Sequence, residues 1–225
     1  MINIKNLWLI EISGVEIWIT ETIFNTWIIM GILILLAIIM RIRMRSFATV
    51  PTGAQNIIEA VVEKFDDFAI QSVGENNRIV VPWFFAVFVF ILSSSLFSPF
   101  GLRAPTADWA TTFAMAIATF IIMVLRGLST RGGYYIKSLF EPHFVFFPIN
   151  LIGELAKPLS LSFRLFGNVL SGTIILTLYY ALTPWLVQIG VPALFHAFFD
   201  VVIGFIQTYI FVIISLMYVS EASSE

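Results

Sequence analysis

Cysteine is absent from the 225 residues of this sequence, and histidine occurs only twice, as His143 and His196. The absence of cysteine excludes disulfides, thiol nucleophiles and thiolate metal ligands. Two imidazoles are too few for a zinc site of the ordinary kind. We therefore expect no metal site and no cofactor.

Signatures of enzymatic chemistry are missing as well. The sequence contains no Gly-rich phosphate loop, no serine elbow and no His-Glu metal motif. We therefore expect a non-catalytic protein without a nucleotide site. The net charge of -2 is also too small to indicate a nucleic-acid partner.

Charged residues are scarce, at 12%, and hydrophobic residues make up 59% of the chain. Soluble domains have about half apolar and about a quarter charged residues. A soluble core of this size could not hide so much apolar surface from water, whereas lipid can. With short loops and no internal repeat, the composition predicts an all-α integral membrane protein and a single domain over residues 1–225.

Long apolar windows mark the expected crossings, and they cover residues 22–40, 80–100, 109–125, 144–182 and 192–219. A crossing takes about 20 residues, so each of the first three spans once. The last two are too long for one perpendicular crossing and must tilt or bend. Pro142, Pro148 and Pro158 are natural bend points at the start of the fourth. The Phe-rich second span is expected to face lipid.

The segment between the first two spans is different in kind. Within residues 51–74, apolar side chains recur at steps of three and four, and acidic ones lie on the other side. This pattern predicts an amphipathic helix that starts at residues 51–53 and lies on the membrane surface. A solvated connector is the alternative.

Basic residues predict the orientation of the chain. Five crossings place Lys5 and Arg103 on one side of the membrane. They place the larger set on the other: Arg41, Arg43, Arg45, Lys64, Arg78, Arg126, Arg131 and Lys137. The positive-inside rule then puts the N-terminus outside and the C-terminus in the cytoplasm. In the outer turn at residues 105–108, Thr106 or Asp108 is expected to cap the third span.

Arg164 is the most informative charge inside an apolar segment. A charged group there costs at least ~3 kcal/mol, so it requires a reason. At about 100° per residue, Arg164 shares one small, polar stripe of a helix with five other residues. They are Lys157, Ser160, Gly167, Asn168 and Ser171. Small residues allow another helix to approach, and arginine keeps its charge when desolvated. The alternative is an arginine that snorkels to the interface or pairs with a structural carboxylate.

A second polar row lies in the last segment. His196, Asp200 and Gln207 are spaced i, i+4 and i+11, which places them within an arc of about 40° on an α-helix. Such a row is typical of a water-filled path or a proton relay. A set of interhelical hydrogen bonds is the alternative. Glu154 and Lys157, three residues apart, are expected to pair with each other.

Residues 159–168, LSLSFRLFGN, resemble the signature of subunit a of F-type ATP synthases. The resemblance covers nearly the whole chain. Residues 51–56 (PTGAQN) resemble the family's first cytoplasmic element, residues 105–108 (PTAD) its outer turn, and residues 207–211 (QTYIF) its closing helix. The length resembles that of bacterial members, which implies the bacterial cell membrane.

This resemblance implies a stator that packs its last two helices, as a hairpin, against a rotating ring of c subunits. Arg164 would face the ring carboxylates, with Asn168 one turn away and Gln207 opposite on the last helix. Ser160, Gly167 and Ser171 would face the ring. Two offset half-channels would load and unload protons, or Na⁺, and couple ion flow to ATP synthesis. Peripheral-stalk b subunits, the remaining synthase subunits and lipid are the other implied partners.

One position departs from the family pattern. Nine residues after the arginine the family often has Glu or His, and here it is Thr173. The complementary acid would be Asp200 alone, with His196 as a possible substitute partner. Outside this family, a self-contained ion channel, a secondary transporter or a structural scaffold are the rival functions.

Overall fold

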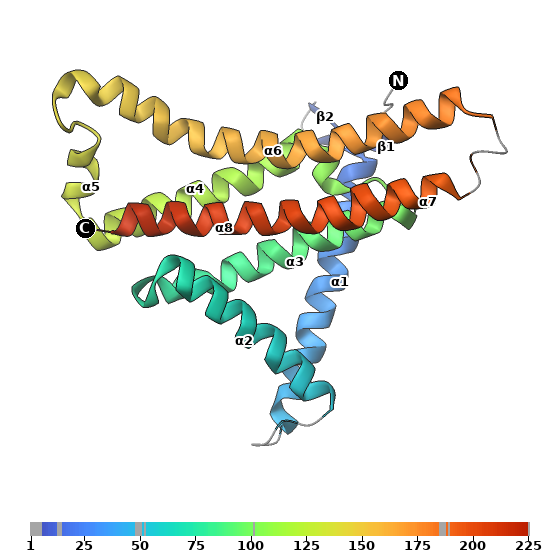
Figure 1. Cartoon of the computed structure of the whole chain (residues 1–225), viewed down its shortest axis with the longest axis horizontal. Coiled ribbons are helices and arrows are strands. Elements are labelled where there is room, and N and C mark those ends of the chain that lie inside the picture. The colour runs from blue at the N-terminus through green and yellow to red at the C-terminus, as the bar shows by residue number, and fades with distance from the viewer. Residues whose placement is uncertain are drawn as a thin grey trace.

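The computed structural model describes residues 6–12, 15–47, 51, 53–100, 102–184, 188 and 190–224, and these residues are mostly helical (Figure 1). Two strands come first, β1 (Asn6–Ile12) and β2 (Val15–Thr20). The α-helices are α1 (Glu21–Arg43), α2 (Ala54–Val73), α3 (Val81–Phe97), α4 (Trp109–Arg131), α5 (Gly133–Ser138), α6 (Phe147–Leu182), α7 (Val191–His196) and α8 (Gly204–Ser223). Short 3₁₀ segments η1 (Met44–Ser46), η2 (Glu75–Val80), η3 (Ser98–Phe100), η4 (Pro105–Ala107) and η5 (Phe144–Phe146) join them, and η6 (Ala197–Ile203) is a π-helix.

The five predicted crossings are confirmed. Within the described residues, five helical stretches are long and apolar enough to span a membrane. They are Glu21–Arg43, Glu75–Phe97, Trp109–Arg131, Phe144–Leu182 and Val191–Ser223. Each overlaps one apolar window. The helices often extend past the window into polar residues because hydrogen bonds within the backbone continue the helix beyond its apolar stretch.

The N-terminal hairpin was not predicted. Strands β1 and β2 pair antiparallel, with Ile12 opposite Val15 and Asn6 opposite Thr20. Trp8 packs edge-on against Phe24 of α1, with ring centroids 5.7 Å apart. The all-α class therefore describes the membrane-spanning part, and a small β-hairpin precedes it.

The core lies between α3, α4 and α8, and it corrects the expectation that the Phe-rich span faces lipid. Phe84 and Ile91 of α3 are fully buried, at 0% exposure. They pack in one cluster with Met123 of α4 and with Val212 and Leu216 of α8. Helix α3 is thus an interior helix. Its phenylalanines supply large apolar area to the protein core rather than to lipid.

Helix α2 is confirmed, and its apolar side divides into two halves. Ile57 and Val61, in the first half, are exposed. In the second half, Phe65 packs edge-on against Phe85 of α3 at 5.0 Å, and Phe68 lies 5.3 Å from Tyr209 of α8. Half of the helix is therefore part of the bundle. Its placement on a membrane surface stays a prediction, and Thr52, in the expected helix start, lies outside the described residues.

Helices α6 and α8 run antiparallel as a long hairpin that ends at the residues before α7 (Figure 1). Helix α6 bows along its length and contains Pro158, which removes one backbone hydrogen bond from the helix. On its other side α6 packs on α4, where Trp109 stacks on Phe163 with ring centroids 5.7 Å apart. Asp108 caps α4 by accepting a hydrogen bond from the Ala110 N–H, as one of the two predicted caps.

Hydrogen bonds of polar side chains join the helices at both ends of the bundle. At one end, called here the basic end, Arg126 Nη2 donates to Asn77 Oδ1 at 2.8 Å. Asn77 Nδ2 in turn donates to Ser223 Oγ at 2.7 Å. At the other end, Asn25 Nδ2 donates to the Arg103 carbonyl at 2.9 Å. Arg126 and Arg103 thus lie at opposite ends, as the charge count predicts. The basic end as the cytoplasmic one stays a prediction, and Lys5 lies outside the described residues.

The contact between α3 and α8 predicts the effect of one methyl group. A Cβ added at Gly204 would lie 2.7 Å from Ser95 Cβ, whereas one added at Gly31 of α1 would meet nothing within 4 Å. Gly204→Ala is expected to destabilise the protein by about 1–3 kcal/mol, since overpacking forces helices apart. Gly31→Ala is the matched control. The melting temperature of the purified protein in detergent measures both, and equal values for the two variants would contradict the close approach.

Candidate functional site

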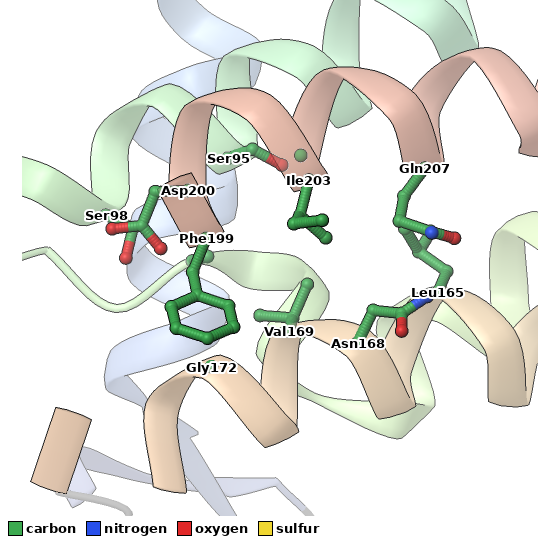
Figure 2. A pocket seen from close by; sticks show the side chains of 12 residues that line it. Ser95, Ser98, Leu165, Asn168, Val169, Gly172, Phe199, Asp200, Ile203 and Gln207 are labelled. Carbon is green, nitrogen blue, oxygen red and sulfur yellow. The ribbon is translucent and has the colours of Figure 1, made fainter. Parts of the chain in front are cut away.

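A small cavity lies where α6 faces η6 and the start of α8 (Figure 2). Its volume is about 20 Å³. Five polar side chains line it, from α3, η3 and both arms of the hairpin: Ser95, Ser98, Asn168, Asp200 and Gln207. A space of this size holds about one water molecule, which needs two to four polar partners. We call it the Asp200 cavity.

Both arms of the hairpin contribute to the polar wall of this cavity. Figure 2 shows Asn168 of α6 and Gln207 of α8 extending toward each other from the two helices, and Asp200 lying beside Ser98. The structure thus brings together three residues that the sequence analysis selected on two separate helices. Their side chains include one carboxylate and two amides, which can exchange hydrogen bonds with water or with an ion.

Asp200 lies within the π-helical segment η6, and the predicted arc is therefore only partly right. A π turn holds more residues than an α turn, so about 100° per residue does not apply across these seven residues. Asp200 and Gln207 do line the same cavity. His196 is not among its lining residues, but His196 Nδ1 lies 2.6 Å from Asp200 Oδ2. His196 is thus a hydrogen-bonding partner of the carboxylate.

Close packing fixes η6 against α6. A Cβ added at Gly172 of α6 would lie 3.3 Å from Phe199 Cβ, so the phenylalanine next to Asp200 sits directly on the α6 backbone. This contact of Phe199 positions the neighbouring Asp200 at the cavity. Segments of π-helix often occur at functional sites.

Arg164 lies on the outside of α6. Its side chain is exposed, and among the described residues it has no hydrogen-bonding or ion-pairing partner. Ser160 and Ser171 are exposed on the same helix, Gly167 is half-buried, and a Cβ added at Gly167 would meet nothing within 4 Å. Ser160, Arg164 and Ser171 therefore form an exposed face of α6 with Arg164 at its centre, whereas Lys157 and Asn168 of the predicted stripe are half-buried. The structural carboxylate that would have explained Arg164 is not present in the described part of the chain.

Thr173 stands where the family that the sequence resembles often has an acid, and it does not line the Asp200 cavity. Thr173 Oγ1 donates to the Val169 carbonyl of its own helix at 2.9 Å. Such a bond satisfies a hydroxyl locally without a partner on another helix. Thr173 instead lines a larger, neighbouring cavity together with Glu21 and Arg103.

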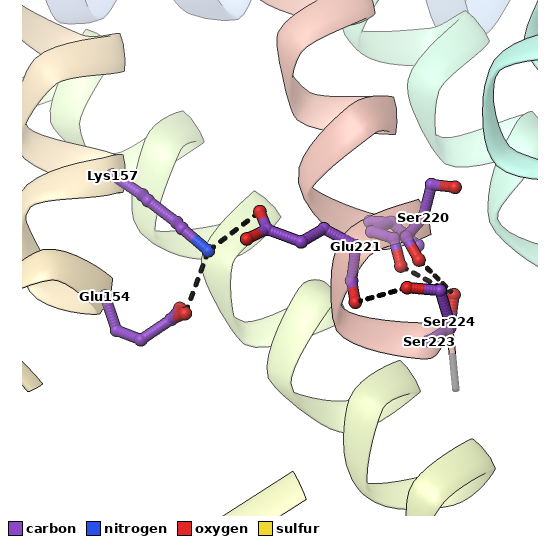
Figure 3. Close-up of polar contacts among 7 residues, drawn as sticks. Glu154, Lys157, Ser220, Glu221, Ser223 and Ser224 are labelled. Atoms are coloured by element: carbon purple, nitrogen blue, oxygen red, sulfur yellow. Dashed lines mark hydrogen bonds and ion pairs between the residues drawn. The ribbon is translucent and has the colours of Figure 1, made fainter. Parts of the chain in front are cut away.

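The predicted pair of Glu154 and Lys157 is confirmed, and a third residue joins it (Figure 3). Lys157 Nζ lies 2.8 Å from Glu154 Oε1 and 3.1 Å from Glu221 Oε2 of α8. It also lies 5.2 Å from the ring centroid of Tyr218. We call this group the Lys157 latch, because it joins α6 to α8 near the basic end. Glu221 was missed because it lies 64 residues away in the sequence.

One titratable group outside the spanning helices is affected by this cluster. Burial raises the pKa of the Tyr135 phenol above its ordinary value, and the negative charge of Glu154 raises it further. Tyr135 of α5 is thus packed as a neutral ring beside the latch. Its ring is also the atom group nearest to a Cβ added at Gly127, at 2.8 Å.

Comparison with known proteins gives one family. The family profile described as "ATP synthase A chain" matches residues 23–220. "ATP synthase subunit a" of Moorella thermoacetica is 35% identical over 226 aligned residues, which cover 98% of this chain and 98% of the relative. "ATP synthase subunit a, sodium ion specific" of Propionigenium modestum is 33% identical and covers 89% of this chain and 73% of the relative. The Trichlorobacter lovleyi protein "ATP synthase subunit a" is 31% identical, over 91% and 88%.

The latch predicts an asymmetric response to removing its members. Lys157→Met leaves the partly buried Glu154 without a counter-charge, so a loss of about 1–3 kcal/mol of stability is expected. Glu221→Gln removes a carboxylate whose side chain is 66% exposed, so it should cost under about 1 kcal/mol. The double variant Lys157→Met/Glu154→Leu should regain part of the loss. Thermal unfolding of the complex measures all three, and equal losses for Lys157→Met and Glu221→Gln would rule out this order.

Proposed function

The chain belongs to the ATP synthase A chain family, which forms part of the membrane sector of F-type ATP synthases, and from this premise we propose that it is the stator of a rotary ion path. The carrying observation is the open stripe on α6, which presents the unpartnered cation of Arg164. A cation without a partner among the described residues fits an anionic partner on another chain. In this proposal the partner is the ring of c subunits, each with one carboxylate.

The stripe supports a moving interface rather than a fixed one. Ser160, Gly167 and Ser171 are small and lie beside Arg164 on the same side of α6. Small residues let a second helix approach closely and slide without large side chains interlocking. The open space at Gly167 has the same consequence.

An ion reaches the ring through a half-channel that opens to the outside and passes Asp200. It neutralises a ring carboxylate, and the neutral site can then rotate through lipid, which a bare carboxylate could not do at low cost. After nearly a full turn the site meets a second half-channel, open to the cytoplasm. Arg164 stabilises the charged form of the ring carboxylate and so favours release of the ion. Its fixed charge also prevents ions from passing directly between the half-channels.

Asp200 is the acid of the outer half-channel in this proposal. Its carboxylate is hydrogen-bonded to His196 and lies on the same cavity as Asn168 and Gln207. These contacts let the carboxylate exchange a proton with its hydrogen-bonding partner. Asn168 lines this cavity and also belongs to the predicted stripe of Arg164, so in this proposal it connects the two.

The rest of the assembly follows from the same premise. Catalysis of ATP formation lies on other subunits, and b subunits of a peripheral stalk hold this chain in place. The N-terminus lies outside and the C-terminus in the cytoplasm, in a bacterial cell membrane. Each ion contributes about 2.3 kcal/mol per 100 mV, so several ions must pass for each ATP.

Replacing the unpartnered cation is the direct test of this function. Arg164→Ala should leave the complex assembled and reduce both ATP synthesis and ATP-driven ion pumping in inverted vesicles to background, since ring carboxylates would lose the charge that discharges them. Arg45→Ala, at an exposed arginine outside the spans, is the matched control and should retain both activities. A structural scaffold or a self-contained channel would instead tolerate Arg164→Ala in coupled transport.

The coupling ion is proposed to be H⁺, with Na⁺ as the second candidate because one relative is named sodium ion specific. Single-site proton exchange at Asp200 and His196 suits H⁺. Pumping by the vesicles should therefore collapse with a proton uncoupler and stay unchanged when Na⁺ is varied from micromolar to millimolar. Pumping that requires Na⁺ and resists the uncoupler would assign Na⁺ instead.

A further inference from the structure

A second cavity lies at the end of the bundle where α1 begins. Its volume is about 230 Å³, and the polar residues on its wall include Glu21, Ser98, Arg103 and Thr173. A space of this size holds several water molecules. We call it the outer cavity, because the proposed orientation places this end of the bundle outside.

The outer cavity adjoins the Asp200 cavity. Ser98, Ala104 and Val169 line both. All three are small or medium-sized, and only Ser98 carries a side-chain group that can both donate and accept a hydrogen bond. Figure 2 shows Ser98 beside Asp200. Within the described residues, Ser98 makes no side-chain hydrogen bond, so its hydroxyl is available to water on either side.

Two charged residues lie on the wall of the outer cavity. Glu21, the first residue of α1, is partly buried, and no ion pair within the described residues joins it to Arg103. Arg103 Nε is buried and has no hydrogen-bonding partner there. A buried N–H that the protein leaves unpaired is satisfied by water or an ion. Asn25 Nδ2 donates to the Arg103 carbonyl at 2.9 Å, which anchors the backbone of Arg103 beside this space.

We propose that Glu21 is the outermost acid of the ion path, in the role that Thr173 cannot fill, and that Ser98 connects the outer cavity to the Asp200 cavity. The inference rests on the proposed function. The Glu21 carboxylate takes up a proton from the medium and passes it to water in the outer cavity, which returns Glu21 to its charged form. Water at Ser98 then passes a proton to Asp200. Each donor is restored, so no further reactant is needed.

The surroundings of Glu21 contain two other charged groups. Arg103 comes from the loop before η4 and lines the same cavity. Asp108 comes from the start of α4, and its Oδ2 accepts a hydrogen bond from Thr22 Oγ1 at 3.2 Å. Asp108 is therefore engaged in capping α4 and holding α1, which leaves Glu21 as the acid on the cavity wall.

Exchanging the acid tests the role of Glu21 in the intact complex. In Glu21→Gln, the rate of ATP synthesis should fall about tenfold when the supply of ions from the outer side limits it. About tenfold is the low end of the effect that a charge at a channel mouth has on the rate at which ions arrive. The dependence of the rate on outer pH should change with it. Thr173→Glu in the same background returns a carboxylate to the cavity wall and should restore most of the rate. Glu16→Gln, an exposed acid of β2, is the matched control and should not change the rate.

Aqueous access to Ser98 is a second, independent measurement. Because the chain has no cysteine, Ser98→Cys introduces its only thiol. A thiol reacts as thiolate, which forms in water and not in an apolar interior. A small, membrane-impermeant thiol reagent added from the outer side should label this chain in Ser98→Cys, and not in Leu216→Cys, whose site is fully buried.

The outcomes separate this inference from the function on which it depends. Loss of transport in Arg164→Ala together with a normal rate in Glu21→Gln overturns the role of Glu21 and leaves the stator function intact. Coupled transport that survives Arg164→Ala overturns the function itself. An unlabelled Ser98→Cys in an assembled complex overturns the connection between the two cavities.

Discussion

A charge placed against lipid must be matched, and the chain meets this requirement everywhere along the α6–α8 hairpin except at one residue. Lys157 has Glu154 and Glu221 within ion-pair distance, and Asp200 has His196. Arg164 has no such partner in the described chain. A lone charge inside lipid costs at least ~3 kcal/mol, and in the stator role proposed above the ring carboxylates supply the counter-charge for Arg164.

Local features of the fold could be predicted from the sequence. Each crossing depends on the composition of one continuous segment, and the Asp108 cap and the pair of Glu154 and Lys157 depend on residues within one helical turn of each other. All were confirmed. Which face of a crossing is buried could not be predicted, because a lipid-facing phenylalanine and a core phenylalanine are chemically alike. Helix α3 was misplaced for this reason. The hairpin of β1 and β2 does carry a sequence signal, because β-branched residues occur in both strands.

The candidate site likewise contains residues that the sequence predicted and one that it did not. Asn168, Asp200 and Gln207 were selected because polar residues are rare in apolar segments, and the fold brings them to one cavity. Glu21 was not selected, because an acid at the start of a first helix is ordinary in sequence. Its significance arises only from the cavity that it shares with Arg103, which lies 82 residues further along the chain. Long-range proximity of this kind is set by the packing of all five crossings together.

The π-helical segment also bears on how this chain is compared with its relatives. A π turn arises when one extra residue is accommodated within a helix without disturbing either flank. Residues after η6, such as Gln207, and residues before it, such as His196, therefore belong to two separate counting frames. Positions aligned from the C-terminal side and from the N-terminal side of the segment can differ by one, and Asp200 lies at that junction. An acid in a relative is therefore equivalent to Asp200 when it occupies the same position in the structure. A one-residue gap in this segment of an alignment records a change of helix geometry.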